Sequence, residues 1–404
     1  MATQLAASKR QDAATVTPQL TLSLVTETYP PEINGVAMTL SRFVTGLQQR
    51  GHRLHLVRPR QPATAPAADT DPPTLTVGGL HLPLYPDLQL GLPAGRRIRR
   101  AWESLRPDIV YIATEGPLGW SALNAARVLD IPVVTGFHTN FHSYSGHYHL
   151  GLLMPLVKRY LRHFHRRGRC TLAPSPEVCE ALSADGFGRM QVLPRGVDTA
   201  LFDPARRSPE LRRQWGLEEA DMAVLYVGRV AAEKNIHEAL AAFRRIQQRR
   251  PEARFIIVGD GPLRTTLARA HPDLIFCGMQ TGTALAAHFA SADLFLFPSR
   301  TETFGNVTLE AMASGLPVVA YDYAAAAMHI RDGSNGVRVA LDRPGEFACR
   351  AEQLAAWEPR RLSTLGQAAR AHTEGLGWDR VVERFESILY ETAFQEPAVH
   401  ASCV

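Results

Sequence analysis

Apolar positions along the chain follow two patterns, which alternate from near residue 20 to near residue 393. One is a short run with few polar residues, typical of a buried strand; the other repeats every three or four positions, typical of an amphipathic helix. The alternation predicts an α/β fold. The strands expected from the runs are residues 21–27, 54–58, 109–114, 132–137, 170–175, 190–193, 223–229, 255–261, 274–278, 294–298 and 317–321.

Helices are expected between many of these strands. The helical pattern covers residues 36–50, 96–105, 119–129, 150–169, 236–249, 307–314 and 378–393. The chain of 404 residues is longer than one ordinary core allows, so we expect two domains that meet near residue 196. Residues 1–19 show no pattern and are expected to be a disordered tail.

Composition limits the class of protein. With 45% hydrophobic and 21% charged residues the chain resembles soluble globular proteins, and no apolar run approaches membrane-spanning length. Its five cysteines have neither the spacing of a zinc site nor the density of a disulfide scaffold, which favours a reducing compartment. The first residues lack the apolar core of a signal peptide. We therefore expect a cytoplasmic protein.

Charge is distributed unevenly. Residues 1–195 contain 21 Lys and Arg against 13 Asp and Glu, whereas the remainder contains 23 against 26. A basic first half indicates an anionic partner, such as a membrane surface, a nucleic acid or an acidic substrate. Residues 150–169 combine an apolar stripe with many basic residues, which fits either a helix lying on anionic lipid or a helix packed on its own core.

Residues 293–321 predict a strand, a loop, a helix and a second strand. Glu302 lies in the loop and Glu310 about one turn into the helix. Between them, Phe304, Gly305 and Asn306 mark the helix start, where free N–H groups can bind a phosphate. This arrangement fits a nucleotide diphosphate-sugar. A glutamate near a helix N-terminus also has an ordinary explanation, since it favours the helix dipole.

Two other loops offer groups that can bind phosphate. Arg229 and Lys234 follow the strand at 223–229 in one loop, and Lys234 is one of only three lysines in the chain. The loop at 28–35 ends on Gly35, but it lacks the GxGxxG pattern and the later acidic residue of a dinucleotide-binding oxidoreductase. That class is therefore excluded.

The remaining candidate is a histidine at a strand end. His138 follows the strand at 132–137, where open α/β sheets place ligand-binding residues. His142 lies four positions later, but no HExxH pattern or third ligand accompanies the pair. Asp69 and Asp71 spell DxD within a loop rich in Pro, Ala and Thr, which is a poor place for a metal. We expect no metal site.

Several of these segments together resemble one family. The segment PSRTETFGNVTLEAMASGLPVVA, with Glu302 and Glu310, is its most specific piece, and VGRVAAEKN, IIVGDGP and the early NGV occur in the same order. They are similar to the retaining nucleotide-sugar glycosyltransferases of family 4, which have the GT-B architecture. Within that family the chain looks closest to members that glycosylate lipids or transfer mannose.

The resemblance implies two Rossmann-like domains facing across a cleft. The first, at 20–196, would face the acceptor, the second, at 197–377, would bind the donor, and a helix at 378–394 would cross back to the first. The implied roles are diphosphate binding by Arg229 and Lys234, donor-sugar binding by Glu302, ribose binding by Glu310, further donor contacts by Phe304, Gly305, Asn306 and Val307, approach of the first domain at Gly35, and a position near the reacting centre for His138.

The resemblance further implies the reaction. A hexose would pass with retention from a UDP- or GDP-linked donor to a hydroxyl of a membrane lipid, such as diacylglycerol or phosphatidylinositol, without a metal or cofactor. The enzyme would lie on the inner face of the membrane and bind no nucleic acid. Transfer to a soluble, polysaccharide or lipopolysaccharide acceptor, a GT-B phosphorylase or epimerase, and a non-catalytic membrane-binding protein remain as alternatives.

Overall fold

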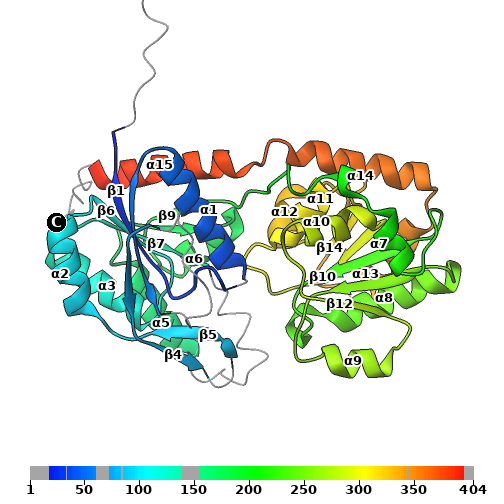
Figure 1. The fold of residues 1–404 in the computed structure, drawn as a ribbon, viewed down its shortest axis with the longest axis horizontal. Coiled ribbons are helices and arrows are strands. Elements are labelled where there is room, and N and C mark those ends of the chain that lie inside the picture. The colour runs from blue at the N-terminus through cyan, green and yellow to red at the C-terminus, as the bar shows by residue number, and fades with distance from the viewer. Residues whose placement is uncertain are drawn as a thin grey trace, which may run out of the picture.

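The computed structural model describes residues 18–32, 34–60, 72–82, 85–138, 154–343 and 345–394. Within these residues the chain forms two parallel sheets and one hairpin, and Figure 1 shows the sheets in two lobes that lie side by side. The α/β fold predicted from the sequence is confirmed. No helix in the described ranges combines the length and apolar composition that crossing a bilayer requires.

The first sheet has seven parallel strands in the order β3-β2-β1-β6-β7-β8-β9. Every residue of β6, β7 and β8 is buried, which explains why these strands read as unbroken apolar runs. The strands are β1 (Thr21–Val25), β2 (Arg53–Pro59), β3 (Thr74–Val77), β6 (Ile109–Ile112), β7 (Val133–Gly136), β8 (Cys170–Ala173) and β9 (Met190–Val192). The helices are α1 (Gly35–Gln49), α2 (Gly95–Leu105), α3 (Pro117–Val128), α5 (Met154–His165) and α6 (Pro176–Ala184).

An antiparallel hairpin precedes α2. It consists of β4 (Gly79–Leu82) and β5 (Tyr85–Gly91), and the sequence analysis predicted no strand there. The β5 sequence contains proline and aspartate, which are uncommon in strands, so its pattern gave no signal. A Cβ on Gly91 would lie 2.7 Å from Leu118, so the end of β5 packs directly on α3.

The second sheet has six parallel strands in the order β12-β11-β10-β13-β14-β15. Its strands are β10 (Ala223–Val227), β11 (Arg254–Val258), β12 (Ile275–Gly278), β13 (Leu294–Phe297), β14 (Val318–Tyr321) and β15 (Val337–Val339). Its helices are α7 (Pro209–Gln214), α8 (Ile236–Arg249), α9 (Arg264–Ala270), α10 (Gly282–Ser291), α11 (Asn306–Ala313), α12 (Ala324–His329), α13 (Glu346–Ala355) and α14 (Pro359–Thr373), with short 3-10 turns at Pro204–Arg206 and Ala232–Lys234.

The order of strands reverses at one place in each sheet. The reversal lies between β1 and β6 in the first sheet and between β10 and β13 in the second. The loops that leave such a pair diverge, and open α/β sheets bind ligands in the crevice between them. Glu27 and Glu115 follow β1 and β6, whereas Lys234 and Glu302 follow β10 and β13. Each sheet therefore places charged side chains at its own reversal point.

The last helix, α15 (Trp378–Phe394), returns to the first sheet, as the resemblance implied. Figure 1 shows α14 along one lobe and α15 along the other. Phe385 stacks on Phe43 of α1 with ring centroids 4.5 Å apart, and Glu386 accepts hydrogen bonds from Arg50 and bonds His52 at 2.7 Å. These buried contacts make α15 part of the first core.

The segment at 199–222, which follows the expected domain boundary near residue 196, is an ordered part of the second lobe and contains α7. Arg212 of α7 is 1% exposed, its guanidinium bonds Asp293 at 2.9 Å, and it also donates to the carbonyls of Glu218 and Asp221. A buried guanidinium with these acceptors fixes α7 against the loop before β13. The residues of this segment that are typical of turns, Ser208 and Pro209, begin the helix α7.

Candidate functional site

Lys234 and Glu302 meet at the carboxyl ends of β10 and β13. Lys234 Nζ lies 2.5 Å from Glu302 Oε1, and Ser299 Oγ donates a hydrogen bond to the same oxygen at 2.7 Å. The lysine side chain is 18% exposed and the glutamate side chain 16% exposed. Sequence reasoning placed both residues near a phosphate, but the ion pair between them required the order of the strands.

Arg229 lies in the same loop as Lys234 and is more exposed. Its guanidinium bonds Glu233 at 2.9 Å, and its backbone carbonyl accepts a hydrogen bond from the hydroxyl of Tyr226. The Arg229 side chain is 43% exposed, whereas that of Glu233 is 9% exposed. The buried acidic partner thus holds a cation at the surface of this loop.

The N-terminus of α11 lies beside this pair in sequence and structure. Gly305 has φ of 86°, a left-handed conformation that glycine adopts without strain, and no side chain caps the helix. The Phe304 side chain is buried and its carbonyl accepts from Ala325 N–H, while Val307 packs against the core. Because the side chains of Phe304 and Val307 pack inward, the groups available to a ligand near Asn306 are the backbone N–H groups at the start of α11.

Glu310 lies on α11 after this N-terminus and is partly exposed. Among the described residues its carboxylate has no hydrogen bond or ion pair. Burial raises the pKa of Glu310 to about 7, since no cation compensates for the lost solvent. A carboxylate in this state is available to hydroxyl donors.

Gly35 is the point where the first lobe approaches α11. A Cβ built on Gly35 would lie 3.7 Å from Asn306 Nδ2, so the first residue of α1 faces the first residue of α11. Unlike α11, α1 is capped, because the Asn34 side chain accepts from the N–H groups of Val36 and Ala37. Two helix N-termini from different lobes therefore converge here.

His138 lies just beyond β7 and is 6% exposed. Its Nδ1 accepts a hydrogen bond from the Arg195 guanidinium at 2.5 Å, and its Nε2 lies 2.6 Å from the hydroxyl of Tyr111. Because a guanidinium can only donate, the ring proton of the neutral imidazole is on Nε2. Burial, and then the charge of Arg195, hold the pKa of His138 well below its usual value.

Sequence reasoning missed both partners of His138. Tyr111 is inside the buried strand β6, and Arg195 follows β9 in a segment interpreted only as a crossing between domains. Burial lowers the pKa of Arg195 to about 10, yet its partners keep it next to the imidazole. His142 and the Asp69–Asp71 pair lie outside the described residues.

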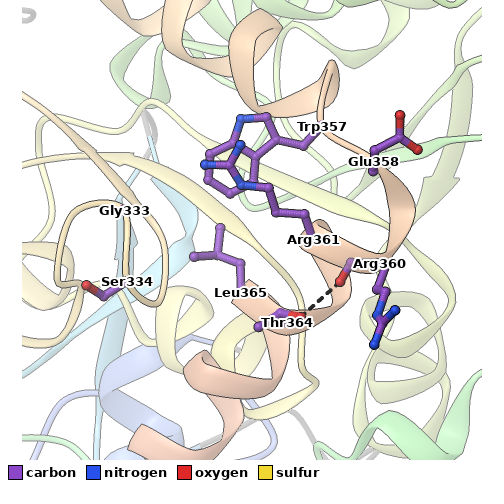
Figure 2. A pocket seen from close by; sticks show the side chains of 8 residues that line it. All are labelled: Gly333, Ser334, Trp357, Glu358, Arg360, Arg361, Thr364 and Leu365. Carbon is purple, nitrogen blue, oxygen red and sulfur yellow. Dashed lines mark hydrogen bonds between the residues drawn. The ribbon is translucent and has the colours of Figure 1, made fainter.

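A separate pocket of about 510 Å³ lies elsewhere in the second lobe (Figure 2). Arg361 stacks on the Trp357 ring at its side, and Gly333 and Ser334 belong to the turn before β15. That turn is at the amino ends of the strands, opposite the edge that carries Lys234. The pocket is therefore not part of the site at the strand ends.

The helix α5 combines two environments. Leu161 and Phe164 are buried in the first lobe, as a core-packed helix requires, whereas Leu156 is 65% exposed and Tyr160 is 39% exposed. Lys158 Nζ lies 3.4 Å from Asp185 Oδ2. Its main apolar stripe thus faces the core, and only the first part of the helix presents apolar side chains to solvent.

Comparison with known proteins matches both halves of the chain to transferases. Residues 33–201 match the family described as Glycosyltransferase Family 4, and residues 221–356 match Glycosyl transferases group 1. A GDP-mannose-dependent alpha-mannosyltransferase of Mycobacterium tuberculosis is 32% identical over 377 residues, covering 91% of this chain and 96% of its own.

Two further relatives and one solved structure extend the comparison. A GDP-mannose-dependent alpha-mannosyltransferase of Mycolicibacterium smegmatis is 36% identical, covering 74% of this chain and 79% of its own. An alpha-monoglucosyldiacylglycerol synthase of Streptococcus pneumoniae is 27% identical, covering 74% and 70%. Sucrose-phosphate synthase from Thermosynechococcus elongatus shares the fold with a TM-score of 0.76 at 17% identity, covering 92% and 99%.

Proposed function

The chain belongs to glycosyltransferase family 4, and on that basis we propose that it is a retaining α-glycosyltransferase that moves a hexose from a nucleotide-diphosphate sugar to a hydroxyl of a lipid. The observation that carries the proposal is the Lys234–Glu302 pair beside the uncapped N-terminus of α11. The pair places a cation beside the first N–H groups of α11, at the carboxyl ends of the strands, where a parallel sheet binds ligands.

The donor half acts through charge. As the bond between sugar and diphosphate breaks, negative charge grows on the leaving phosphate. Lys234, Arg229 and the N–H groups at the start of α11 stabilise that charge without moving, which is electrostatic preorganisation. Gly305 leaves room for the phosphate to approach the backbone. The step needs no metal.

The two glutamates bind the two other parts of the donor: Glu302 binds the sugar and Glu310 binds the ribose. Glu302 uses one oxygen for Lys234 and Ser299, which leaves its other oxygen for a hydroxyl of the sugar. Glu310, which has no partner among the described residues, accepts the ribose hydroxyls. His138 stays neutral beside Arg195 and positions the reacting end of the sugar, with Gly35 closing the site from the first lobe.

A GDP-linked mannose is the first donor to test, because the two mycobacterial relatives are GDP-mannose-dependent. A lipid acceptor is supported by the similarity to a glucosyldiacylglycerol synthase and by the basic first half of the chain. Exposed arginines on α2 (Arg96, Arg97, Arg99 and Arg100) and the exposed Leu156 of α5 support a peripheral position on anionic membranes.

The test is sugar transfer in EDTA with GDP-mannose or UDP-glucose and vesicles that contain diacylglycerol or phosphatidylinositol. The expected product is an α-linked glycolipid, and Lys234→Ala should reduce its formation by about 10²- to 10³-fold. Arg213→Ala removes an exposed cation of α7, outside the site and outside the surface proposed to face the membrane, and is the control. Transfer only to a soluble saccharide would replace the lipid acceptor, and phosphorolysis or epimerisation of the sugar without transfer would refute the proposal.

A further inference from the structure

A buried carboxylate occupies the reversal point of the first sheet, the counterpart of the place that holds Lys234 and Glu302 in the second. Glu27 follows β1 and is 7% exposed. Its Oε1 accepts hydrogen bonds from the N–H of Gly91 at 3.3 Å and of Leu118 at 3.1 Å. Its Oε2 has no hydrogen bond or ion pair among the described residues.

Oε2 of Glu27 lies in space that is left by the missing side chain of Gly116. A Cβ on Gly116, the residue that caps α3, would lie 1.9 Å from Oε2, so any other residue at position 116 would collide with this oxygen. The carboxylate therefore lies directly over the backbone at the start of α3. The N–H groups of Gly91 and Leu118 bind Oε1, and the absence of a Cβ on Gly116 leaves space for Oε2.

Within the part of the chain that the structure describes, no cation neutralises Glu27. The titratable groups that face it are Glu115, from the loop after β6, and Tyr160 of α5. The remaining contacts are the backbone N–H groups of Gly91 and Leu118. Burial and the charge of Glu115 raise the pKa of Glu27 to about 7. Burial, with smaller contributions from Glu115 and Glu27, raises the pKa of Tyr160 to about 12, which keeps its hydroxyl neutral.

Glu115 is itself held in a buried network. Its Oε1 lies 3.3 Å from Nε2 of His165, whose Nδ1 lies 2.9 Å from the hydroxyl of Thr135, and the hydroxyl of Tyr160 donates to the Glu115 carbonyl. These bonds orient Glu115 without pairing Glu27. The result is a carboxylate whose Oε2 has no partner among the described residues, at a position where α/β sheets bind ligands.

We propose that Glu27 binds a hydroxyl of the acceptor through Oε2, and that the part of the acceptor entering this crevice carries no phosphate. A carboxylate oxygen that has no partner, as Oε2 has none among the described residues, gains most from a hydroxyl donor. A phosphate in the same place would face Glu27 and Glu115 with like charge, which is strongly unfavourable. The acceptor class is thus a neutral hydroxyl compound, either the glycerol end of a lipid or a sugar.

This inference rests on the proposed transferase function, and one set of assays separates the two. Glu27→Gln preserves an oxygen for the N–H groups of Gly91 and Leu118 but removes the charge. At saturating donor, kcat/KM for the acceptor should fall by about 10- to 100-fold, whereas donor hydrolysis without acceptor should stay within about twofold of wild type. Glu27→Asp, which keeps the charge, should retain more activity than Glu27→Gln.

The pH profile gives a readout that a purely structural role would not move. In the wild type, kcat/KM for the acceptor should rise with pH as Glu27 ionises, and this rise should disappear in Glu27→Gln. Glu210→Gln, which removes an exposed charge on α7 of the second lobe, is the control and should behave as wild type. An unchanged acceptor KM in a folded Glu27→Gln, or equal losses in transfer and donor hydrolysis, overturns the assignment.

Three acceptors distinguish the chemistry: vesicles with diacylglycerol, vesicles with phosphatidylinositol, and methyl α-mannoside in solution. A preference for diacylglycerol or the free sugar supports a neutral acceptor and says which source supplies it. A preference for phosphatidylinositol overturns that part of the inference. If the wild type does not turn over the donor at all, the transferase function itself is refuted, independently of the role of Glu27.

Discussion

Lys234 Nζ lies 2.5 Å from Glu302 Oε1, across 68 positions of sequence, where the strand order of the second sheet reverses. The pair makes each residue dependent on the other. We expect Lys234→Met and Glu302→Gln each to lower the free energy of unfolding by about 1 kcal/mol, and the double variant to lose less than the sum. Urea unfolding of all four proteins measures the coupling; strict additivity would contradict it.

Gly35 should matter for transfer and not for folding. A methyl group at position 35 would lie 3.7 Å from Asn306 Nδ2, an ordinary contact, so Gly35→Ala should fold normally. The methyl would nevertheless occupy the space between the two helix N-termini and reduce kcat/KM for the donor, by about tenfold or more. Gly95→Ala is the matched control, because Gly95 also begins a helix and its Cβ contact is 3.9 Å.

Glu310, proposed to bind the donor, should also make the stability of the protein depend on pH. Its folded pKa of about 7 exceeds its ordinary value of 4.5, so its contribution to the free energy of unfolding is full below pH 4.5 and is lost as pH rises through about 7. Glu310→Gln should therefore be more stable than wild type at alkaline pH, by roughly 1–3 kcal/mol, and nearly equal in acid. Thermal unfolding across this range measures the difference.

The same substitution should weaken donor binding. An amide replaces a carboxylate that has no other partner among the described residues, and the loss of charge-assisted hydrogen bonds corresponds to about 10- to 100-fold in Kd. Calorimetric titration with GDP and UDP tests this. Unchanged affinity for both nucleotides would remove Glu310 from the donor site.

The imidazole of His138 should remain neutral. Burial and Arg195 hold its pKa well below the usual value, and Arg195 fixes the proton on Nε2. Nitrogen NMR of histidine-labelled protein should show that the His138 ring does not titrate between about pH 5 and pH 8, where an ordinary histidine does. Arg195→Met should remove the donor to Nδ1 and release this restraint.

The return of α15 depends on a glycine. A Cβ on Gly46 of α1 would lie 2.6 Å from a methyl group of Val382, so Gly46→Ala should destabilise the chain by about 1–3 kcal/mol. Because the obstacle is a side chain, Gly46→Ala with Val382→Ala should recover part of the loss. Guanidinium unfolding of the single and double variants checks both statements.

Local signals determined much of the fold. The unbroken apolar runs identified β6, β13 and β14 because a strand buried on both faces has no polar alternation. Gly315 and Pro317 ended the helix that became α11, and the spacing of Glu302 and Glu310 carried the family resemblance. Each of these features is formed by residues close together in the chain, so it can be recognised from the sequence without knowledge of the tertiary structure. The hairpin of β4 and β5, and α7, lacked such a local signal.

Tertiary structure alone decided which charged groups meet. His138 bonds Tyr111 and Arg195, which are 27 and 57 positions away, and the Glu27 side chain accepts from Leu118, 91 positions away. No spacing rule relates such residues, because the order of strands in the sheet sets their separation. The sequence by itself therefore determined the fold class and the family, and it supplied the prediction of the donor residues. Burial and strand order decided that His138 is neutral and that Glu27 Oε2 has no partner among the described residues at the reversal point of the first sheet.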